Sequence, residues 1–286
     1  MADAPLYANV NGIRVAYDRT GDGFPLLLLH GFPRTRRTWA QVTPPLAERF
    51  TVVAPDRRGY GDSDRPSDPA AYDNAHMAQD ALELTQHLGW TEFLVVGHDK
   101  GAPVARRLAA DHPESVRGAM IIDGIAEGAS VDRPRDTTGR QWYFDFFRQR
   151  GVAEQIIGQD PGLFFGLFLD RNPHLSPEQR AFYVEQFSKP GTTEAVLADY
   201  RAALEGDREK WAEETASGAR IRTPMYFIWG ADGPVGGAPV LDAWAQVADD
   251  IRGGEAIPNA AHYVHEMQPE ATVRHIMRFA DELGVP

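Results

Sequence analysis

The sequence predicts an α/β fold: a doubly wound, mostly parallel sheet with a helical cap inserted between two core strands. Three observations support this prediction. Short apolar runs alternate with helix-like segments along most of the chain. The alternation stops after Asp123, where helix-like, aromatic-rich stretches take its place. Polar or glycine-containing turns follow several apolar runs, at the strand ends where open α/β sheets bind ligands.

The expected strands form a hairpin and a set of buried runs. Asn11-Gly12 separates residues 7–10 from residues 13–17, which is a strong hairpin signal. Continuous apolar runs are typical of strands buried on both faces of a parallel sheet. They lie at residues 25–29, 51–54, 93–96, 119–122 and 225–229.

The expected helices belong to two groups. Those of the core alternate with the strands and cover residues 75–88, 102–111, 241–248 and 269–283. Those of the insertion cover residues 142–147, 163–169, 181–187 and 193–204. We therefore expect a core formed by residues 1–127 and 208–286, and a helical cap formed by residues 128–207. A cap at this position encloses an apolar pocket over the carboxyl ends of the strands.

Composition narrows the function classes. The 286 residues carry a net charge of -12, which argues against a general nucleic-acid-binding protein. The lack of cysteine excludes disulfides, thiolate catalysis and cysteine-based metal sites. The first residues do not have the pattern of a secretory signal, and no apolar run is long enough to cross a membrane. We expect a cytoplasmic protein that binds neither nucleic acid nor membranes.

The pentapeptide Gly97-His98-Asp99-Lys100-Gly101 lies between an apolar run and a helix-like segment. A strand, a tight Gly-x-x-x-Gly turn and a helix form a nucleophile elbow, whose central residue is exposed for attack. The central residue here is an aspartate. A carboxylate is already charged at neutral pH and needs no base to become a nucleophile. Asp99 is therefore the candidate nucleophile for attack on an alkyl carbon, with formation of an alkyl ester.

Hydrolysis of such an ester requires a base that activates water, usually a histidine oriented by an acid. His262 lies shortly before the last expected helix, where the chain order nucleophile, acid, histidine places the base. The residues alone leave two acids open, because Asp123 and Asp232 each follow an expected strand. The backbone N–H groups of Phe32 and Lys100 are candidates for an oxyanion hole that holds the ester carbonyl oxygen.

Five motifs of the chain form a common pattern. They are residues 30–33 (HGFP) with Trp39, residues 56–63 (DRRGYGDS), the elbow at 97–101, residues 111–113 (DHP) and residues 261–263 (AHY). With this pattern the chain resembles the α/β-hydrolase superfamily over nearly its whole length. Within it, the aspartate at the elbow resembles the branch of epoxide hydrolases, haloalkane dehalogenases and haloacetate (fluoroacetate) dehalogenases.

The resemblance implies roles for further residues. In haloacetate dehalogenases and similar enzymes the acid lies about one strand after the nucleophile in a Leu-Asp-like pair, and Ile122-Asp123 matches it, which favours Asp123 over Asp232. Epoxide hydrolases use two cap hydroxyls, usually tyrosines, to donate hydrogen bonds to the epoxide oxygen. Tyr143 and Tyr200 resemble such a pair.

The chain departs from the haloacetate dehalogenase pattern at the cap and at the elbow. Trp142 and Tyr200 match the leaving-group residues of those enzymes, but Gln141 replaces their halide-binding histidine. Lys100 and Pro103 replace two arginines that grip the substrate carboxylate there. Lysine keeps one charge without the bidentate fork, and proline supplies no donor. Both departures favour an epoxide over a haloacid.

We therefore expect a hydrolase that converts epoxides to diols through an ester on Asp99. A haloacid or haloalkane dehalogenase is the alternative, and a non-catalytic small-molecule receptor on the same fold is an alternative of another class. The expected partners are a small apolar or weakly polar organic substrate and water, with His30, Trp142 and Gln141 at the substrate. Neither a metal nor an organic cofactor is expected, since the histidines show no metal-ligand spacing. The resemblance suggests a homodimer.

Overall fold

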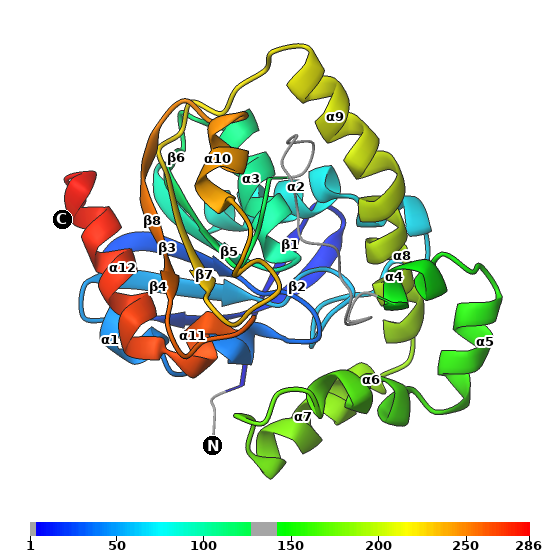
Figure 1. The fold of residues 1–286 in the computed structure, drawn as a ribbon. Coiled ribbons are helices and arrows are strands. Elements are labelled where there is room, and N and C mark those ends of the chain that lie inside the picture. Colours follow the sequence, from blue (N-terminus) through cyan, green and yellow to red (C-terminus); the bar gives the residue numbers. More distant parts are fainter. Residues whose placement is uncertain (1–3, 127–141) are drawn as a thin grey trace.

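The computed structural model describes residues 4–126 and 142–286, which contain one eight-stranded sheet flanked by helices (Figure 1). The strands are β1 (Leu6–Val10), β2 (Ile13–Thr20), β3 (Phe24–Leu29), β4 (Phe50–Pro55), β5 (Phe93–His98), β6 (Val116–Ile122), β7 (Met225–Gly230) and β8 (Ile251–Ile257). Their order in the sheet is β1-β2-β4-β3-β5-β6-β7-β8.

The sheet is parallel except at one edge. β1 and β2 form the expected antiparallel hairpin, and β2 is antiparallel to β4. All other neighbours are parallel, so the predicted doubly wound, mostly parallel sheet is confirmed. Because the parallel strands run in one direction, the residues that follow β3, β5, β6 and β7 meet at a single edge. Asp99 and Asp123 follow β5 and β6 there.

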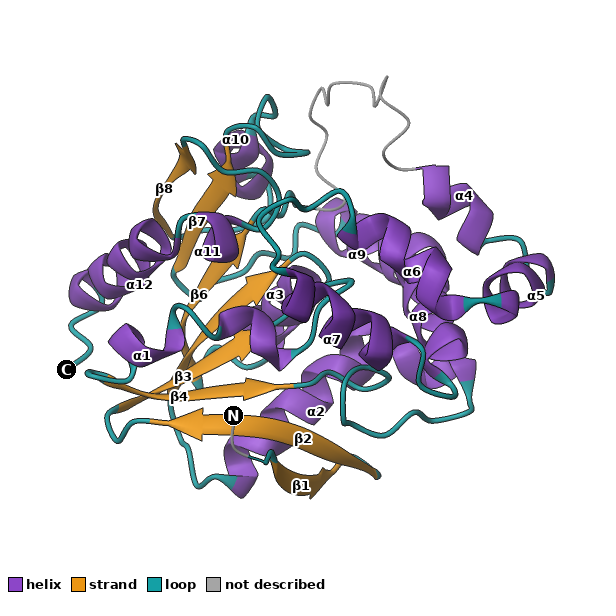
Figure 2. Ribbon diagram, turned by 90° about the horizontal axis from the view of Figure 1, so that it is seen from below, coloured by secondary structure: helices purple, strands orange, loops and turns teal. Residues whose placement is uncertain are grey.

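Helices cover both faces of the sheet (Figure 2). They are α1 (Thr43–Leu46), α2 (Asn74–His87), α3 (Gly101–Asp111), α10 (Val240–Ala245), α11 (Val264–Met267) and α12 (Pro269–Glu282), with the 3-10 helices η1 (Arg36–Trp39) and η2 (Pro69–Tyr72). α2, α3 and α10 share one buried apolar cluster with the sheet, to which Leu84, Leu108 and Trp244 belong. α1, α11 and α12 share a second cluster on the opposite face.

Further helical segments lie between β6 and β7. They are α4 (Trp142–Phe147), α5 (Val152–Gln159), α6 (Pro161–Leu169), α7 (Pro177–Phe187), α8 (Thr192–Ala202), the π-helix η3 (Ala203–Asp207) and α9 (Arg208–Ala216). Segments from α4 to α8 pack around a third apolar cluster, which also contains Phe32 and Tyr60 from loops of the sheet. α9 packs on α3 instead, with the Arg106 guanidinium 3.6 Å from the ring centroid of Trp211. The division into core and cap at residues 207 and 208 stays a proposal.

The expected strands and helices are present, most of them with shifted ends. The sequence analysis does not predict β8 or the helices α1, α5, α9 and α11. Within residues 4–126 and 142–286, no helix is both long enough and apolar enough to cross a membrane.

Candidate active site

Asp99 lies at the sharp turn between β5 and α3. Its backbone has the left-handed conformation, with φ of 51°, which residues other than glycine rarely adopt. The turn is tight, because a Cβ atom on Gly101 would lie 2.2 Å from the Leu29 carbonyl oxygen. A larger residue at position 101 would push α3 away from β3. The elbow therefore presents the Asp99 carboxylate, with 21% of its side chain exposed, at the carboxyl edge of the sheet.

His262 joins Asp99 to Asp123. Its Nδ1 atom lies 2.5 Å from Asp123 Oδ2, and its Nε2 atom lies 3.2 Å from Asp99 Oδ2. The second Asp123 oxygen accepts a hydrogen bond from the Gly230 N–H at 3.1 Å, which fixes the carboxylate on the end of β7. The structure thus brings together the three residues that the sequence predicts as nucleophile, base and acid.

The opposite charges within this trio shift the pKa values of His262 and Asp99. Burial alone would lower the pKa of His262, but hydrogen bonds and charges from Asp123 and Asp99 raise it to about 10. Burial would raise the pKa of Asp99, but the hydrogen bond and charge of His262, together with the Phe32 N–H, hold it far below its usual value. At neutral pH the resting site therefore contains a protonated His262 between two carboxylates.

The loop after β3 supplies a hydrogen-bond donor to the nucleophile. The Phe32 N–H donates to Asp99 Oδ1 at 2.7 Å. The preceding Gly31 permits this contact, because a Cβ atom there would lie 2.3 Å from Asp99 Cβ. Phe32 thus occupies the position expected of an oxyanion-hole donor. The matching role of the Lys100 N–H, at the start of α3, stays a prediction.

Two further histidines pack against the trio. The His98 ring centroid lies 4.7 Å from that of His262, and His98 Nε2 donates to the His262 carbonyl oxygen at 2.9 Å. His265 lies 4.6 Å from His98, and its Nε2 atom pairs with Thr38 Oγ1 at 2.7 Å. Burial keeps the pKa values of both rings below the usual range, so both remain uncharged beside the protonated His262. They hold the loop that carries the base.

Among the described residues, neither Asp232 nor His30 hydrogen-bonds to the trio, although both were predicted as site residues. The Asp232 side chain is exposed, and His262 Nδ1 faces Asp123 instead. His30 is buried, with one ring nitrogen 2.9 Å from the Gly31 carbonyl oxygen and the other accepting from the Arg57 N–H at 3.1 Å. These contacts order the loop, and a direct contact of His30 with substrate stays a prediction. Gln141 lies outside the described residues.

The predicted cap residues Tyr143 and Tyr200 pack on Phe32 of the loop after β3, and we call these three rings the aromatic wall. The Tyr200 ring centroid lies 5.3 Å from that of Phe32 and 5.7 Å from that of Tyr143. Burial raises the pKa of Tyr200 well above its usual value, and the neighbouring Tyr143 and Asp99 raise it further. The Tyr200 hydroxyl is therefore protonated and able to donate. Trp142, at the start of α4, stacks on Phe168 at 6.3 Å and leaves 42% of its surface exposed.

The sequence analysis assigns no role to a buried ion cluster beside the elbow. We call it the Asp199 cluster; it consists of Arg57, Tyr60, Lys100 and Asp199. Asp199 Oδ1 lies 2.8 Å from Lys100 Nζ, and Asp199 Oδ2 accepts from Arg57 at 3.1 Å and from the Tyr60 hydroxyl at 2.6 Å. The only sequence signal was the position of Asp199 directly before Tyr200.

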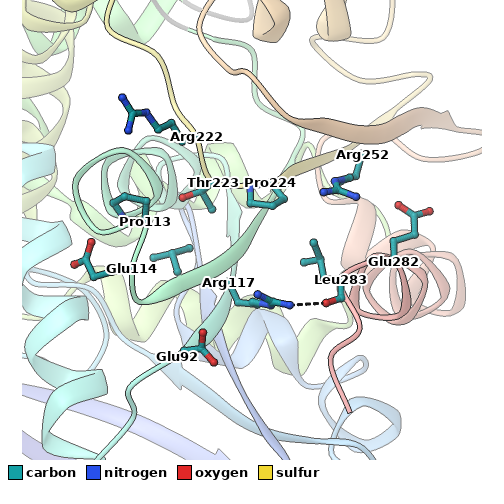
Figure 3. A pocket seen from close by; sticks show the side chains of 11 residues that line it. Glu92, Pro113, Glu114, Arg117, Arg222, Thr223, Pro224, Arg252, Glu282 and Leu283 are labelled. Atoms are coloured by element: carbon teal, nitrogen blue, oxygen red, sulfur yellow. Dashed lines mark hydrogen bonds between the residues drawn. The ribbon is translucent and has the colours of Figure 1, made fainter.

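A separate cavity of about 360 Å³ lies away from this site (Figure 3). Its lining includes Val116, Pro224 and Arg252, at or next to the amino-terminal ends of β6, β7 and β8. Arg117 also lines it and donates to the Leu283 carbonyl oxygen at 2.9 Å. Asp99, Asp123 and His262 do not line it. We therefore place the candidate active site at the carboxyl edge of the sheet.

The fold and the trio agree with the known proteins that the chain resembles. Residues 25–269 match the family model described as the alpha/beta hydrolase fold. The match spans most of the chain, and this protein therefore belongs to the alpha/beta hydrolase fold family.

Individual relatives lie in the predicted branch. The chain is 34% identical over 282 residues to the soluble epoxide hydrolase of Corynebacterium sp. (strain C12), with 95% of each chain covered. It is 32% identical over 273 residues to the fluoroacetate dehalogenase of Burkholderia sp., covering 92% of this chain and 88% of the relative. The solved structure of epoxide hydrolase CorEH without ligand has a TM-score of 0.87 and 33% identity, covering 98% of this chain and 99% of that chain. The predicted resemblance is confirmed.

Proposed function

We propose that this protein is an epoxide hydrolase that forms an ester between substrate and Asp99. The observation that carries the proposal is the trio of Asp99, His262 and Asp123, in which a carboxylate replaces the hydroxyl of a serine hydrolase. A serine would need a neutral histidine as its base, whereas His262 is protonated at neutral pH. An anionic nucleophile needs no proton acceptor and works beside a cation. The similarity to a soluble epoxide hydrolase supports this assignment.

In the first step, Asp99 opens the epoxide ring. Asp99 Oδ1 is held by the Phe32 N–H, so Oδ2 is the atom that we infer to attack a ring carbon. A C–O bond forms to Oδ2 as the ring C–O bond breaks, and the ring oxygen leaves with the electron pair. The hydroxyls of Tyr143 and Tyr200 are proposed to donate hydrogen bonds to this developing alkoxide. The ester keeps its carbonyl oxygen at the Phe32 N–H.

In the second step, His262 activates water. Ester formation removes the negative charge of Asp99, which is one cause of the raised pKa of His262. The pKa then falls, and His262 gives its proton to the alkoxide that ring opening produced, which becomes the first hydroxyl of the diol. Neutral Nε2 then accepts a proton from a water molecule whose oxygen attacks the ester carbon. Phe32 stabilises the resulting oxyanion. Collapse of this intermediate breaks the bond between the ester carbon and the alkyl oxygen, and that oxygen takes the proton from His262 as the diol leaves. The Asp99 carboxylic acid then returns a proton to His262, which regenerates the carboxylate and the protonated histidine.

A dehalogenase is the second candidate, because attack of the same carboxylate on an alkyl carbon can also displace a halide. The similarity to a fluoroacetate dehalogenase and the aromatic wall around Tyr200 favour it. The leaving group distinguishes the two functions. We expect the wild-type protein to convert styrene oxide to its diol, measured by chromatography, and to release no chloride from chloroacetate. Chloride release without diol formation would reverse the assignment.

The two tyrosines provide a sharper test of ring opening. We expect substitution of both Tyr143 and Tyr200 by phenylalanine to lower kcat for styrene oxide by at least about 10²-fold, because each lost donor of this type costs roughly 10²–10³. The control is Phe182→Tyr, which adds a hydroxyl to an aromatic residue of α7 that does not belong to the third apolar cluster. Unchanged epoxide turnover in the double variant would exclude these hydroxyls from ring opening.

The two steps are expected to respond differently to pH. In the resting enzyme the pKa of Asp99 is far below neutrality and that of His262 is about 10, so ester formation should vary little between about pH 6 and 9. Ester hydrolysis needs neutral His262 and should therefore increase with pH until it passes the lowered pKa of the ester form. Rapid-quench single turnovers with mass detection measure both rates. Ester formation that falls as the pH decreases through 7 would contradict the proposed charge states.

A further inference from the structure

Tyr263 joins the loop that carries the base to the loop after β3. It follows His262 directly in the chain, and its hydroxyl donates to the Phe32 carbonyl oxygen at 2.9 Å. The N–H of the same Phe32 donates to Asp99 Oδ1 at 2.7 Å. One hydrogen bond therefore holds Phe32 from the side of the base, while the other connects Phe32 to the nucleophile. The proposed reaction steps leave the Tyr263 hydroxyl without a role.

The loop after β3 transmits a shift of the Phe32 carbonyl to the Phe32 N–H. The Arg34 N–H donates to the Gly31 carbonyl oxygen at 3.1 Å, which closes a tight turn over residues 31–34. Phe32 is buried, and a buried carbonyl that loses its donor is unfavourable. Without the Tyr263 hydroxyl, we expect this carbonyl to move toward another donor and to carry the N–H away from Asp99 Oδ1.

The Tyr263 ring is itself held in place. The Arg34 guanidinium lies 3.8 Å from the ring centroid, and its Nε and Nη2 atoms donate to the two Glu266 oxygens at 2.8 and 2.9 Å. Burial would raise the pKa of Glu266, but Arg34 and His174 hold it well below its usual value, so the carboxylate is ionised. Burial raises the pKa of Tyr263, so its hydroxyl keeps the proton that it donates.

The two halves of the proposed reaction use the Phe32 N–H differently. During ester formation Asp99 Oδ1 loses negative charge, so its hydrogen bond from Phe32 weakens. During ester hydrolysis the same oxygen becomes an oxyanion, so the hydrogen bond strengthens. A donor accelerates only the step in which its interaction is stronger in the transition state than before it. A displaced Phe32 N–H should therefore slow ester hydrolysis and leave ester formation unchanged.

We propose that Tyr263 is a positioning residue whose hydroxyl directs the Phe32 N–H at the oxygen that becomes the oxyanion, and that it thereby accelerates hydrolysis of the ester. Tyr263 acts through Phe32 and not by contact with the reacting atoms. This inference rests on the proposed ester on Asp99. The position of the Phe32 N–H can nevertheless be measured without any substrate.

The kinetic test uses the variant Y263F, which removes the hydroxyl and keeps the ring that Arg34 covers. Y226F is the matched control, because Tyr226 is also buried and its hydroxyl pairs with His275 Nδ1 at 3.0 Å, away from the trio. In rapid-quench single turnovers of styrene oxide, hydrolysis of the ester should be at least about tenfold slower in Y263F, which is less than the loss of a whole donor. Ester formation in Y263F, and both steps in Y226F, should match the wild type.

The pH dependence of hydrolysis distinguishes an effect on Phe32 from an effect on the neighbouring His262. A displaced oxyanion donor lowers the rate at every pH and leaves the apparent pKa of the step unchanged. A displaced base changes the contacts that set the pKa of His262, and the apparent pKa moves. A moved apparent pKa in Y263F, or equal slowing of both steps, would overturn the proposal.

Hydrogen exchange of the Phe32 N–H, measured by NMR in the protein without substrate, tests its position directly. We expect exchange at least about tenfold faster in Y263F than in the wild type or Y226F. The Phe93 N–H of β5, which donates to the Ser115 carbonyl oxygen at 2.9 Å, is the reference and should not change. Unchanged exchange at Phe32, or equal acceleration at Phe93, would overturn the proposal.

Failure of the proposed reaction gives a different result. If the wild type forms neither ester nor diol from styrene oxide, the epoxide hydrolase assignment fails, and hydrogen exchange at Phe32 still decides whether Tyr263 positions this N–H. If diol forms and the Phe32 exchange is the same in Y263F and the wild type, the assignment stands and the role of Tyr263 fails.

Discussion

A His262→Gln variant is expected to stop after the first half of the reaction and to accumulate the ester on Asp99. Glutamine keeps the approximate volume of the imidazole and a polar end, but it cannot accept a proton from water. Because general bases contribute about 10²–10⁴ to rate, turnover of styrene oxide should fall by at least 10²-fold. The first step loses only the imidazolium beside Asp99. Intact mass spectrometry should therefore show one added epoxide mass per chain.

The same experiment distinguishes substrates and controls for damage. Incubation with chloroacetate in place of the epoxide would give an added mass only if the protein is a haloacid dehalogenase. His275→Gln replaces a histidine on α12 that pairs with the Tyr226 hydroxyl at 3.0 Å, on the face of the sheet away from the cap. This control should turn over epoxide and retain no added mass. A His262→Gln variant that gains mass from neither compound would argue against Asp99 as the nucleophile.

The sheet could be predicted where burial leaves a simple pattern. β3, β4, β5 and β7 are each covered on both faces, so a continuous apolar run marks them in the sequence. β8 is different because it lies at the edge of the sheet and is only half-buried. Gly253 and Gly254 interrupt it, and Gly254 allows close approach to β7, since a Cβ atom there would lie 2.6 Å from the Phe227 carbonyl oxygen. No apolar run marks such a strand.

The unpredicted helices depend on contacts between distant segments. α9 is strongly charged, and the sequence analysis assigns its residues to the core without predicting a helix there. Its single buried aromatic residue, Trp211, lies against the guanidinium groups of Arg106 and Arg107 on α3. Arg107 also pairs with Glu214 at 2.7 Å. These contacts join residues about a hundred positions apart, which no local pattern reports.

Residues of the candidate site could be predicted from the sequence where they lie shortly after a strand. Position along the chain identifies Asp99 and His262 but leaves Asp123 and Asp232 open, and the family resemblance favours Asp123. The structure places Asp99, Asp123 and His262 in contact. Asp199 was not identified, because its ionic partners lie 99 and 142 residues away. A buried charge is recognised only when its counter-charges are known. The residues that define the chemistry are therefore more visible in the sequence than this buried charge.

The choice between Asp123 and Asp232 leads to the second large expected effect. Both residues follow strands, but only Asp123 contacts His262, and its left-handed backbone, with φ of 51°, directs the carboxylate toward that ring. Asparagine also tolerates this conformation, so Asp123→Asn should fold normally. The variant loses the anion that orients and charges His262, and by analogy with other catalytic triads turnover should fall by about 10⁴-fold.

Asp232→Asn is the matched control for this prediction, because it is the same chemical change at an exposed side chain after the next strand. Its turnover of styrene oxide should stay within about twofold of the wild type. Thermal unfolding of both variants shows whether a loss arises from folding. Asp123→Asn should also retain the ester on Asp99, since it acts through the base, and this accumulation separates a positioning role from a general loss of structure. A larger loss in Asp232→Asn than in Asp123→Asn would transfer the role of the acid to Asp232.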